Sequence, residues 1–258
     1  KNFYSLSDLQ KISPSFIIIS NPTDIHYDTL NEIYKFNIPL FIEKPLFNIK
    51  GDKEFALVKA IHSNNSTYIA CNLRFHKGVL KMKELLQNKR VEEVNIYCGS
   101  YLPNWRPNKN FRNIYSSNKD QGGGVHIDLI HELDYLYWIF GEPLKRNHTF
   151  SNSSSLEISA YDYANYLWQY KQFNANVVLN YYRKDTKRTF EVLTSKGTFL
   201  LDLLKNKIWF NDEQIYFEEQ NVLDLYEDQM RFFLNNALNR KNKFNTIKEG
   251  YKILELCF

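Results

Sequence analysis

The segment FIIISNPTDIHYDTLNEIYKFNIPLFIEKP, residues 16–45, decides the fold of this chain. Phe16–Ser20 and Ile38–Ile42 are short, continuously apolar runs rich in β-branched residues, which is the pattern of strands buried on both faces. The apolar residues between these runs recur at helical spacing. A second helical pattern, Asp52–Ser63, leads to a third apolar run, Thr67–Cys71. Strands that alternate with helices at this spacing predict βαβ units in a parallel sheet.

A different pattern occupies the rest of the chain. Lys77–Gln87 is expected to be a helix and Val91–Tyr101 a strand, and one long helix is expected at about Val125–Phe140. From Leu156 to Phe217 the pattern is mostly strand-like, which predicts an antiparallel meander with one buried face. A terminal helix at about Val222–Leu238 should cover that face. The predicted fold class is therefore α/β plus α+β, a parallel sheet followed by a large, mostly antiparallel open sheet.

The composition is that of a soluble globular protein, since 43% of the 258 residues are hydrophobic and 24% are charged. The net charge is only +4 and no run of five basic residues occurs, so no nucleic-acid partner is expected. The three cysteines are widely spaced and suggest neither a disulfide framework nor a thiolate zinc site. No apolar run approaches the ~18–20 residues that cross a bilayer. We therefore expect a cytoplasmic protein with no membrane partner.

Polar residues follow each of the three predicted parallel strands. The first strand leads into Asn21–His26, the second into Glu43–Pro45 and the third into Asn72–His76. Ligands of an open parallel sheet bind outside the carboxyl ends of its strands. Three polar segments that converge on one edge therefore predict a binding cleft there. The alternatives are a solvated ion pair for Glu43 and Lys44 and a helix-start residue without a function for His26.

The predicted long helix offers a second group of ionisable residues. Asp128 and His131 are three positions apart, so they share one face of a helix, as a catalytic pair or as a structural hydrogen-bonded pair. Gly122–Gly124 precede the helix and permit either close approach of a ligand or a tight turn. His126 and Asp128 point in different directions on a helix, so no metal site is expected. Arginines elsewhere suit a phosphate or carboxylate, with solvated surface as the alternative; they are Arg106, Arg112, Arg183 and Arg188.

Four segments of the chain resemble the glucose–fructose oxidoreductase and inositol dehydrogenase family, often written Gfo/Idh/MocA. They are NPTDIH (21–26), EKP (43–45), NLRFH (72–76) and GGGVHIDLIHELDYLYWIFGEP (122–143). The resemblance is firm from about Phe16 to Pro143, and only the architecture resembles the family beyond that point. The gap between Asp128 and His131 is one residue shorter than in many members, as in a branch associated with bacterial surface-sugar biosynthesis.

The resemblance implies a partial Rossmann dinucleotide-binding domain over residues 1–75 and an α+β substrate and oligomerisation domain over residues 76–258. It implies NAD or NADP as cofactor, a sugar or nucleotide-sugar substrate, and a homo-oligomer formed through the C-terminal sheet. The G-x-G-x-x-G segment that cradles a dinucleotide pyrophosphate does not occur in the sequence. We therefore expect the first βαβ unit to precede Lys1.

The resemblance also assigns roles residue by residue. The catalytic candidates are Lys44, Asp128 and His131. The cofactor-binding candidates are Asn21, Pro22, Thr23, His26, Glu43, Lys44, Asn72 and Arg74. The substrate candidates are Trp105, Arg106, Arg112 and Arg183.

The predicted function is transfer of hydride between a nicotinamide cofactor and a hydroxyl-bearing sugar carbon. A histidine with a reference pKa of ~6.5 suits the general base, and Lys44 can polarise or protonate the same oxygen. The residues alone do not decide between His131 and Lys44 as the base. Two alternatives are a non-catalytic sugar- or nucleotide-binding protein on the same scaffold and a glycosidase that uses bound NAD.

Overall fold

The computed structural model describes residues 12–237 and 243–258 of the chain. These residues form two compact units, the first from residues up to Cys71 together with Tyr226–Glu255, and the second from Asn72–Leu225 together with Leu256–Phe258. The sequence assigned residues 226–255 to the second domain, whereas in the structure they pack with the first unit. Every helix within the described ranges is too short or too polar to span a bilayer.

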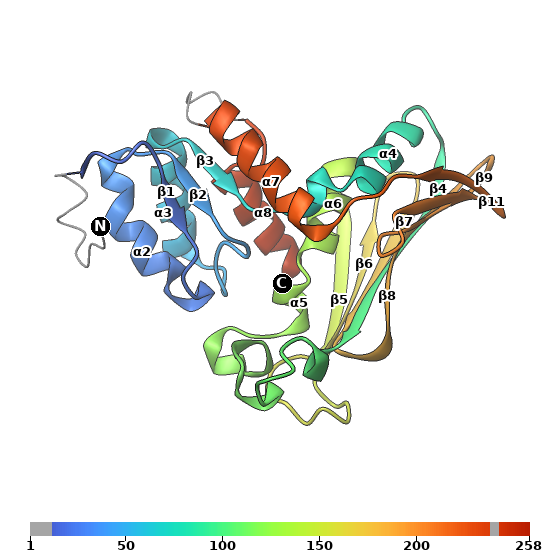
Figure 1. Ribbon diagram of the computed structural model, residues 1–258, viewed down its shortest axis with the longest axis horizontal. Helices are drawn as coiled ribbons and strands as arrows, with labels where there is room; N and C mark the ends of the chain where they lie inside the picture. The colour runs from blue at the N-terminus through green and yellow to red at the C-terminus, as the bar shows by residue number, and fades with distance from the viewer. Residues whose placement is uncertain (1–11, 238–242) are drawn as a thin grey trace. The chain divides into compact units, whose positions relative to one another are not determined.

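The first unit contains a three-stranded parallel sheet in the order β1-β2-β3 (Figure 1). The prediction of a parallel sheet is confirmed, with Leu40 opposite both Ile17 and Thr67 in the two ladders. The elements up to residue 71 are β1 (Ile17–Ile19), η1 (Thr23–Ile25), α2 (His26–Ile33), η2 (Tyr34–Phe36), β2 (Leu40–Ile42), α3 (Asp52–Asn64) and β3 (Thr67–Ile69).

Helices from both ends of the chain cover this small sheet. Phe41 and Tyr68 contact the ring of Phe233, which lies in the π-helical turn η8 (Phe233–Ala237) after α7 (Val222–Phe232). Helix α8 (Ile247–Cys257) packs beside α3, where the rings of Phe55 and Tyr251 stack at 5.6 Å. Strands β2 and β3 are buried throughout, which explains why they are continuously apolar. The burial of both faces predicted for Phe16–Ser20 is not found, because Ile18 of β1 is 47% exposed. The predicted end of the terminal helix at Leu238 lies outside the described residues.

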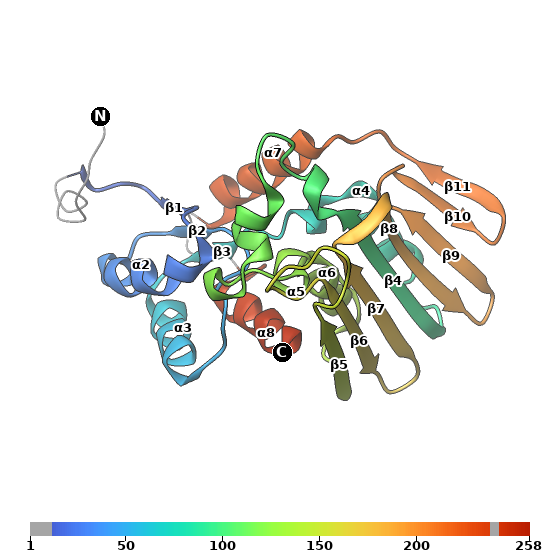
Figure 2. The same cartoon turned by 90° about the horizontal axis from the view of Figure 1, so that it is seen from below.

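The second unit is built on an eight-stranded sheet in the order β11-β10-β9-β8-β4-β7-β6-β5. Figure 2 shows these strands side by side as a twisted fan. The strands are β4 (Val91–Tyr101), β5 (Lys145–Ser151), β6 (Tyr163–Gln169), β7 (Asn174–Asn180), β8 (Tyr182–Thr194), β9 (Gly197–Asp202), β10 (Lys207–Phe210) and β11 (Glu213–Phe217). The prediction of a large, mostly antiparallel sheet is confirmed.

The predicted simple meander is wrong in its pairing. Strand β4 lies between β7 and β8, pairs parallel to β7 and antiparallel to β8, and so separates two strands that are consecutive in the sequence. Alternation reveals which residues lie in strands, but it carries no information about such a distant partner. The strand expected from Leu156 begins only at β6, because a turn with Glu157 in the left-handed region precedes it. Strand β5 was not expected at all.

Three helices cover one face of the large sheet, as Figure 1 shows. They are α4 (Lys77–Leu85), α5 (Val125–Asp128) and α6 (His131–Phe140). Their apolar side chains lie against buried strand residues such as Phe190, which contacts Tyr135 and Phe140. The opposite face has polar pairs such as Asn165 and Asn176, at 2.9 Å. Among the described residues of this unit, no helix covers that face.

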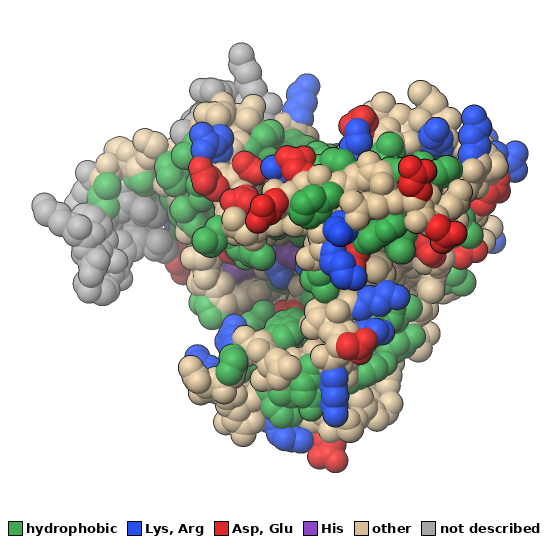
Figure 3. All heavy atoms as spheres, turned by 45° about the vertical axis from the view of Figure 1, so that its right-hand side comes forward, with side chains coloured by type: hydrophobic (Ala, Val, Ile, Leu, Met, Phe, Trp, Pro, Cys, Tyr) green, Lys and Arg blue, Asp and Glu red, His purple; other side chains and the backbone are tan. Residues whose placement is uncertain are grey.

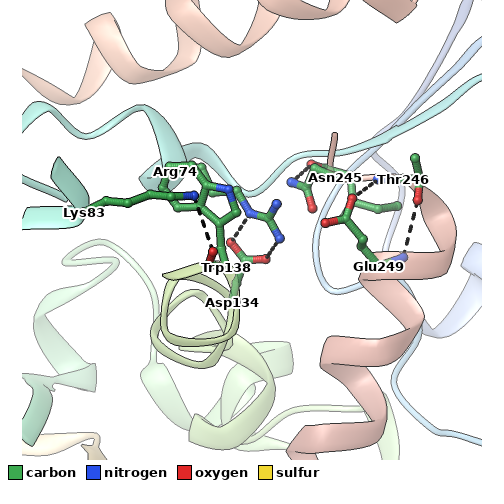
Figure 4. A network of polar contacts seen from close by, with 8 residues as sticks. Arg74, Lys83, Asp134, Trp138, Asn245, Thr246 and Glu249 are labelled. Carbon is green, nitrogen blue, oxygen red and sulfur yellow. Dashed lines mark hydrogen bonds and ion pairs between the residues drawn. The ribbon is translucent and has the colours of Figure 1, made fainter. Parts of the chain in front are cut away.

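A buried ion pair joins two elements on the covered side of the sheet. Arg74, in the 3-10 turn η3 (Asn72–Phe75), donates from Nε and Nη2 to the two carboxylate oxygens of Asp134 at 3.0 and 2.8 Å. Both side chains are fully buried, and Figure 4 shows the guanidinium pointing at the carboxylate. This forked geometry satisfies both charges where water does not reach them.

Replacement of Asp134 by Asn should lower the free energy of unfolding by about 3 kcal/mol or more, because the guanidinium of Arg74 would remain buried without a counter-ion. The matched control is Glu84→Gln, which removes the carboxylate of an exposed pair with Lys81 and should change stability little. Denaturant unfolding of both variants measures the difference. Equal losses would contradict the structural role given to the buried pair.

Candidate functional site

The loops after β1 and β2 are joined by a buried histidine. His26 lies within 3.0 Å of two backbone carbonyl oxygens, that of Asn21 through Nε2 and that of Leu46 through Nδ1. Burial lowers the pKa of His26, so the ring is neutral at physiological pH and donates to one carbonyl only. The side chain is 1% exposed. His26, expected among the cofactor-binding residues, therefore fixes the two loops that hold the other candidates.

The side chains that these loops leave accessible suit a polar ligand. Glu43 and Lys44 are half-buried directly after β2, and burial raises the pKa of Glu43. Asn21 donates from Nδ2 to Thr29 at 2.7 Å, while its buried Oδ1 accepts no hydrogen bond from the described residues. A buried acceptor without a donor matches a ligand hydroxyl or amide, such as those of a nicotinamide nucleotide. The residues of this edge therefore fit the expected cofactor.

Two other cofactor candidates lie in η3, which belongs to the second unit. Asn72 is 8% exposed, and Arg74 is occupied by Asp134 through both of its donor groups described above. The position of the Arg74 side chain therefore gives it a structural role. Pro22 is exposed and Thr23 is half-buried at the start of η1.

The long helix expected at about Val125–Phe140 is in fact two helices. Helix α5 ends at Asp128 and α6 begins at His131, with Leu129 at φ −97° and ψ 30° between them. Spacing on one continuous helix therefore does not describe how Asp128 and His131 are related. Leu129 and its apolar neighbours are nevertheless buried, as the pattern predicted. Their burial shows that the hydrophobic pattern locates the covered side even where the helix is interrupted.

The three glycines before α5 form a tight turn. A side chain at Gly123 would meet the backbone carbonyl of Tyr115 at 2.0 Å, and Gly122 and Gly124 have φ of 76° and 134°. Only glycine adopts all three positions without strain. Of the two roles considered for this segment, the structure supports close packing against the chain's own backbone.

Asp128 is held by two tyrosines that sequence reasoning missed. The hydroxyl of Tyr115 donates to Oδ1 at 2.7 Å, and the hydroxyl of Tyr181 donates to Oδ2 at 2.5 Å. Asp128 is 4% exposed. Tyr115 follows the arginine-rich loop, which carries Arg106 and Arg112, and Tyr181 lies between β7 and β8, so no local spacing connects either tyrosine to Asp128. The substrate candidates Arg112 and Arg183 were the nearest residues in the sequence that had been assigned a role.

His131 is half-buried at the first position of α6. The next residue, Glu132, is fully buried and accepts a hydrogen bond from Nε of Arg188 in β8 at 2.7 Å. This ion pair fixes the start of α6 to the sheet, and with it the backbone of His131.

Two of the four substrate candidates lie beside the tyrosines that hold Asp128. Trp105 packs edge-on against the Tyr181 ring at 5.3 Å, and the guanidinium of Arg106 lies 5.8 Å from the centre of the Tyr115 ring. Arg112 is exposed and lies 3.6 Å from a carboxylate oxygen of Glu157. These contacts bring Trp105 and Arg106, but not Arg112, next to the tyrosines that hold Asp128.

Arg183 lies at the start of β8 on the open face of the sheet. Its guanidinium pairs with Asp185 and lies 5.1 Å from the centre of the Tyr97 ring, and Lys187 approaches the same ring. Figure 3 shows Lys and Arg side chains one below another on the face viewed there. No group of three His, Cys, Asp or Glu side chains within the described ranges is arranged to hold a metal ion.

Comparison with known proteins shows a family resemblance. Residues 79–200 match the family described as GFO/IDH/MocA C-terminal domain. This segment of the chain is similar to the Gfo/Idh/MocA family. The matched segment includes α5, α6 and most of the large sheet, so it includes Asp128 and His131.

Individual members of the Gfo/Idh/MocA family extend the comparison. The 2,7-anhydro-N-acetylneuraminate hydratase of Escherichia coli K12 is 27% identical over 127 residues, which are 49% of this chain and 33% of that protein. The structure of UDP-N-acetylglucosamine 3-dehydrogenase from Acidithiobacillus ferrooxidans gives a TM-score of 0.81 at 17% identity, over 100% of this chain and 80% of that one. The WlbA dehydrogenase of Bordetella pertussis, in complex with NADH and UDP-GlcNAcA, gives a TM-score of 0.74 at 17% identity, over 98% and 78%.

These comparisons show the fold and a family resemblance over residues 79–200. The matched part spans about a third of the E. coli hydratase, and the two dehydrogenase structures share less than a fifth of their residues with this chain. The reaction is therefore a separate question from the family.

A buried histidine near Asp128 predicts a pH dependence of stability. Burial, with a smaller effect from His148, lowers the pKa of His126 to about 4. The unfolded chain takes up a proton near pH ~6.5, before the folded chain does, so stability is complete above that pH and is lost as the pH falls toward 4. At about pH 5 the loss from His126 should reach about 2 kcal/mol.

Thermal unfolding between about pH 7.5 and about pH 5 tests this expectation. The variant His126→Gln should lose clearly less of its melting temperature over that range than the wild type. The exposed His62, replaced by Gln, is the control and should leave the wild-type dependence unchanged. An equal pH dependence in all three proteins would show that His126 is not responsible.

Proposed function

We propose that this protein is an NAD(P)-dependent oxidoreductase that moves hydride to or from a hydroxyl-bearing carbon of a sugar or nucleotide sugar. The observation that carries the proposal is the buried, doubly hydrogen-bonded Asp128, three residues before His131. This is where the Gfo/Idh/MocA resemblance puts the catalytic aspartate and histidine. Lys44, half-buried directly after β2, supplies the third group of the proposed catalytic set.

The proposed chemistry divides between proton and hydride. The nicotinamide, when bound, supplies the redox partner for the sugar carbon. A sugar hydroxyl loses its proton as its carbon is oxidised, so a base must lie at that oxygen. His131 is our choice for the base, because an imidazole titrates near neutral pH, and Lys44 would polarise the same oxygen. Asp128 would orient the reacting groups through its fixed carboxylate.

The cofactor-binding role is proposed for the loops after β1 and β2. The Oδ1 atom of Asn21 offers a buried acceptor, and the half-buried Glu43 offers a carboxylate to ribose hydroxyls. His26 would keep these loops in place by its contacts with the backbone of both. We propose NAD or NADP without choosing between them, because none of the residues assigned above is proposed to contact the ribose 2′ position, where the two cofactors differ.

A nucleotide sugar or acidic sugar is the proposed substrate class. Arg106 is exposed beside the Tyr115 ring, and Arg183 leads a basic stretch with Lys184 and Lys187, so cationic groups are available for a phosphate or carboxylate. The names of the A. ferrooxidans and B. pertussis dehydrogenases support UDP-linked amino sugars as the first compounds to test. A role in cytoplasmic synthesis of surface polysaccharides or nonulosonic acids is part of this proposal.

The E. coli relative favours a second candidate. A protein named as a hydratase of an anhydro-neuraminate adds water to its substrate, which involves no net redox change. The same catalytic residues could serve a reaction in which the nicotinamide ends each turnover as it began. Net formation of reduced or oxidised nicotinamide distinguishes the dehydrogenase from this alternative and from an NAD-dependent glycosidase.

Replacement of His131 by Asn or of Lys44 by Ala should lower turnover by about 10²-fold or more, because each removes a group proposed to move or stabilise a proton. Nicotinamide absorbance with a panel of UDP-sugars and neuraminate derivatives measures turnover. The exposed residues His62 and Lys35 provide the controls His62→Asn and Lys35→Ala, which should keep wild-type rates.

The result is decisive in both directions. Wild-type rates in the two catalytic variants would remove their assigned roles. Conversion of substrate with no net change in nicotinamide would replace the dehydrogenase proposal by the hydratase or glycosidase alternative. Binding of sugars without any conversion would favour the non-catalytic alternative.

We also propose a homo-oligomer formed through the open face of the large sheet. Leu167 is 48% exposed on that face, beside the Asn165–Asn176 pair. Replacement of Leu167 by Asp should shift the protein toward monomer in sedimentation velocity, because a carboxylate would be buried without a partner. The control Leu80→Asp places the same charge on α4, where Leu80 is 44% exposed, and should leave assembly unchanged. A monomeric wild type would contradict the proposal.

A further inference from the structure

We propose that Tyr115 and Tyr181 are positioning residues that fix the carboxylate of Asp128 and link it to Trp105 and Arg106. This inference rests on the proposed function, because it assigns the tyrosines to the same reaction. It adds two residues that neither the spacing of the chain nor the family resemblance assigned.

The two hydrogen bonds occupy both oxygens of one carboxylate. Tyr115 donates to Oδ1 and Tyr181 donates to Oδ2, so rotation of the carboxylate would break both contacts. A hydrogen bond to a charged group stabilises more than one between neutral groups. Asp128 ends a helix of only four residues, α5, and the helix itself gives its side chain little support. The tyrosines therefore supply the restraint that the short helix lacks.

The donors are themselves held by their backbones. Tyr181 is fully buried; its N–H donates to the carbonyl of Asp162 at 2.9 Å, and its carbonyl accepts from the N–H of Leu102 at 2.8 Å. The backbone carbonyl of Tyr115 packs against Gly123, and any side chain at position 123 would clash with it. Two segments far apart in the sequence thus converge on Asp128 from fixed positions.

Both tyrosines remain donors at physiological pH. Burial, together with the neighbouring carboxylate of Asp128, raises the pKa of Tyr115 and of Tyr181 above the usual value. Neither hydroxyl therefore releases its proton to the carboxylate. Asp128 therefore accepts a hydrogen bond at each of its two oxygens, and these two bonds fix its orientation.

Each tyrosine also contacts a residue proposed to bind the substrate. The Trp105 ring meets Tyr181 edge-on, and the Arg106 guanidinium lies over Tyr115. Trp105 is itself held by a hydrogen bond from Nε1 to Ser100 Oγ at 2.9 Å. A substrate that binds to Trp105 or Arg106 would therefore contact residues that pack against Tyr181 and Tyr115, the side chains that orient Asp128. This arrangement joins substrate recognition to the geometry of the catalytic carboxylate.

Removal of either hydroxyl tests the proposal. Tyr115→Phe and Tyr181→Phe should each lower kcat by about tenfold or more and change KM less than about threefold, because orientation is lost while the binding surface remains. The matched control is Tyr166→Phe. Tyr166 is fully buried in the same sheet and donates to the backbone carbonyl of Cys257 at 3.1 Å rather than to Asp128. Its loss should lower the melting temperature comparably and leave kcat unchanged.

A second measurement does not depend on turnover. The melting temperatures of Tyr181→Phe, Asp128→Asn and the double variant form a cycle, and the double variant should lose clearly less than the sum of the single losses. Additive losses would show that Tyr181 does not hold Asp128. Wild-type kcat in both tyrosine variants, with the cycle intact, would reduce the tyrosines to structural residues and overturn the proposal.

Failure of the proposed function gives a different result. If the wild type converts no sugar and no nicotinamide, the reaction assigned above is wrong and the positioning role falls with it. The thermal cycle would still report whether the tyrosines hold Asp128, so the two failures are distinguishable.

Discussion

The contact on which the second unit's candidate chemistry depends is the carboxylate of Asp128 between two tyrosine hydroxyls. A buried carboxylate is stable only when hydrogen bonds replace the water it has lost. Here the donors come from a loop and from a strand connection, so folding of both segments is needed before Asp128 is satisfied. The positions of the arginine-rich loop, the glycine turn and the end of β7 therefore all affect the carboxylate of Asp128.

Two buried ion pairs make this arrangement rigid. Arg74 pairs with Asp134 and Arg188 pairs with Glu132, and both carboxylates lie in the first turn of α6. Both carboxylates are fully buried, and an unpaired charge there would cost several kcal/mol. The interruption at Leu129 separates α5 from α6, so Asp128 and His131 are oriented by different partners. The tyrosines orient one and the ion pair with the sheet orients the backbone of the other.

Local sequence patterns predicted much of the fold because its elements are local. The strands Leu40–Ile42 and Thr67–Ile69 are buried throughout, and such burial leaves a continuous apolar signature. The insertion of β4 between β7 and β8 left no such trace, because pairing depends on residues some 80 positions away, as with Tyr97 and Val178. The break at Leu129 was equally hidden, since the apolar pattern continues through it.

The candidate site was predictable to a similar degree. Polar residues at strand ends led to Asn21 and Lys44, because a parallel sheet gathers its ligands at that edge. The same reasoning did not anticipate that Arg74 pairs with Asp134, since a partner 60 residues away cannot be recognised before the chain is folded. Tyr115 and Tyr181 were missed for the same reason. Groups whose partners are distant in sequence are the ones that sequence reasoning fails to assign.

Isotope transfer tests the central claim most directly. A sugar or nucleotide sugar with deuterium at the reacting carbon would be incubated with the wild-type protein and oxidised nicotinamide cofactor, and the recovered cofactor analysed by mass spectrometry. The account predicts that deuterium leaves the sugar carbon and appears in the reduced nicotinamide ring. Conversion of the sugar with all of its deuterium retained at that carbon would contradict it.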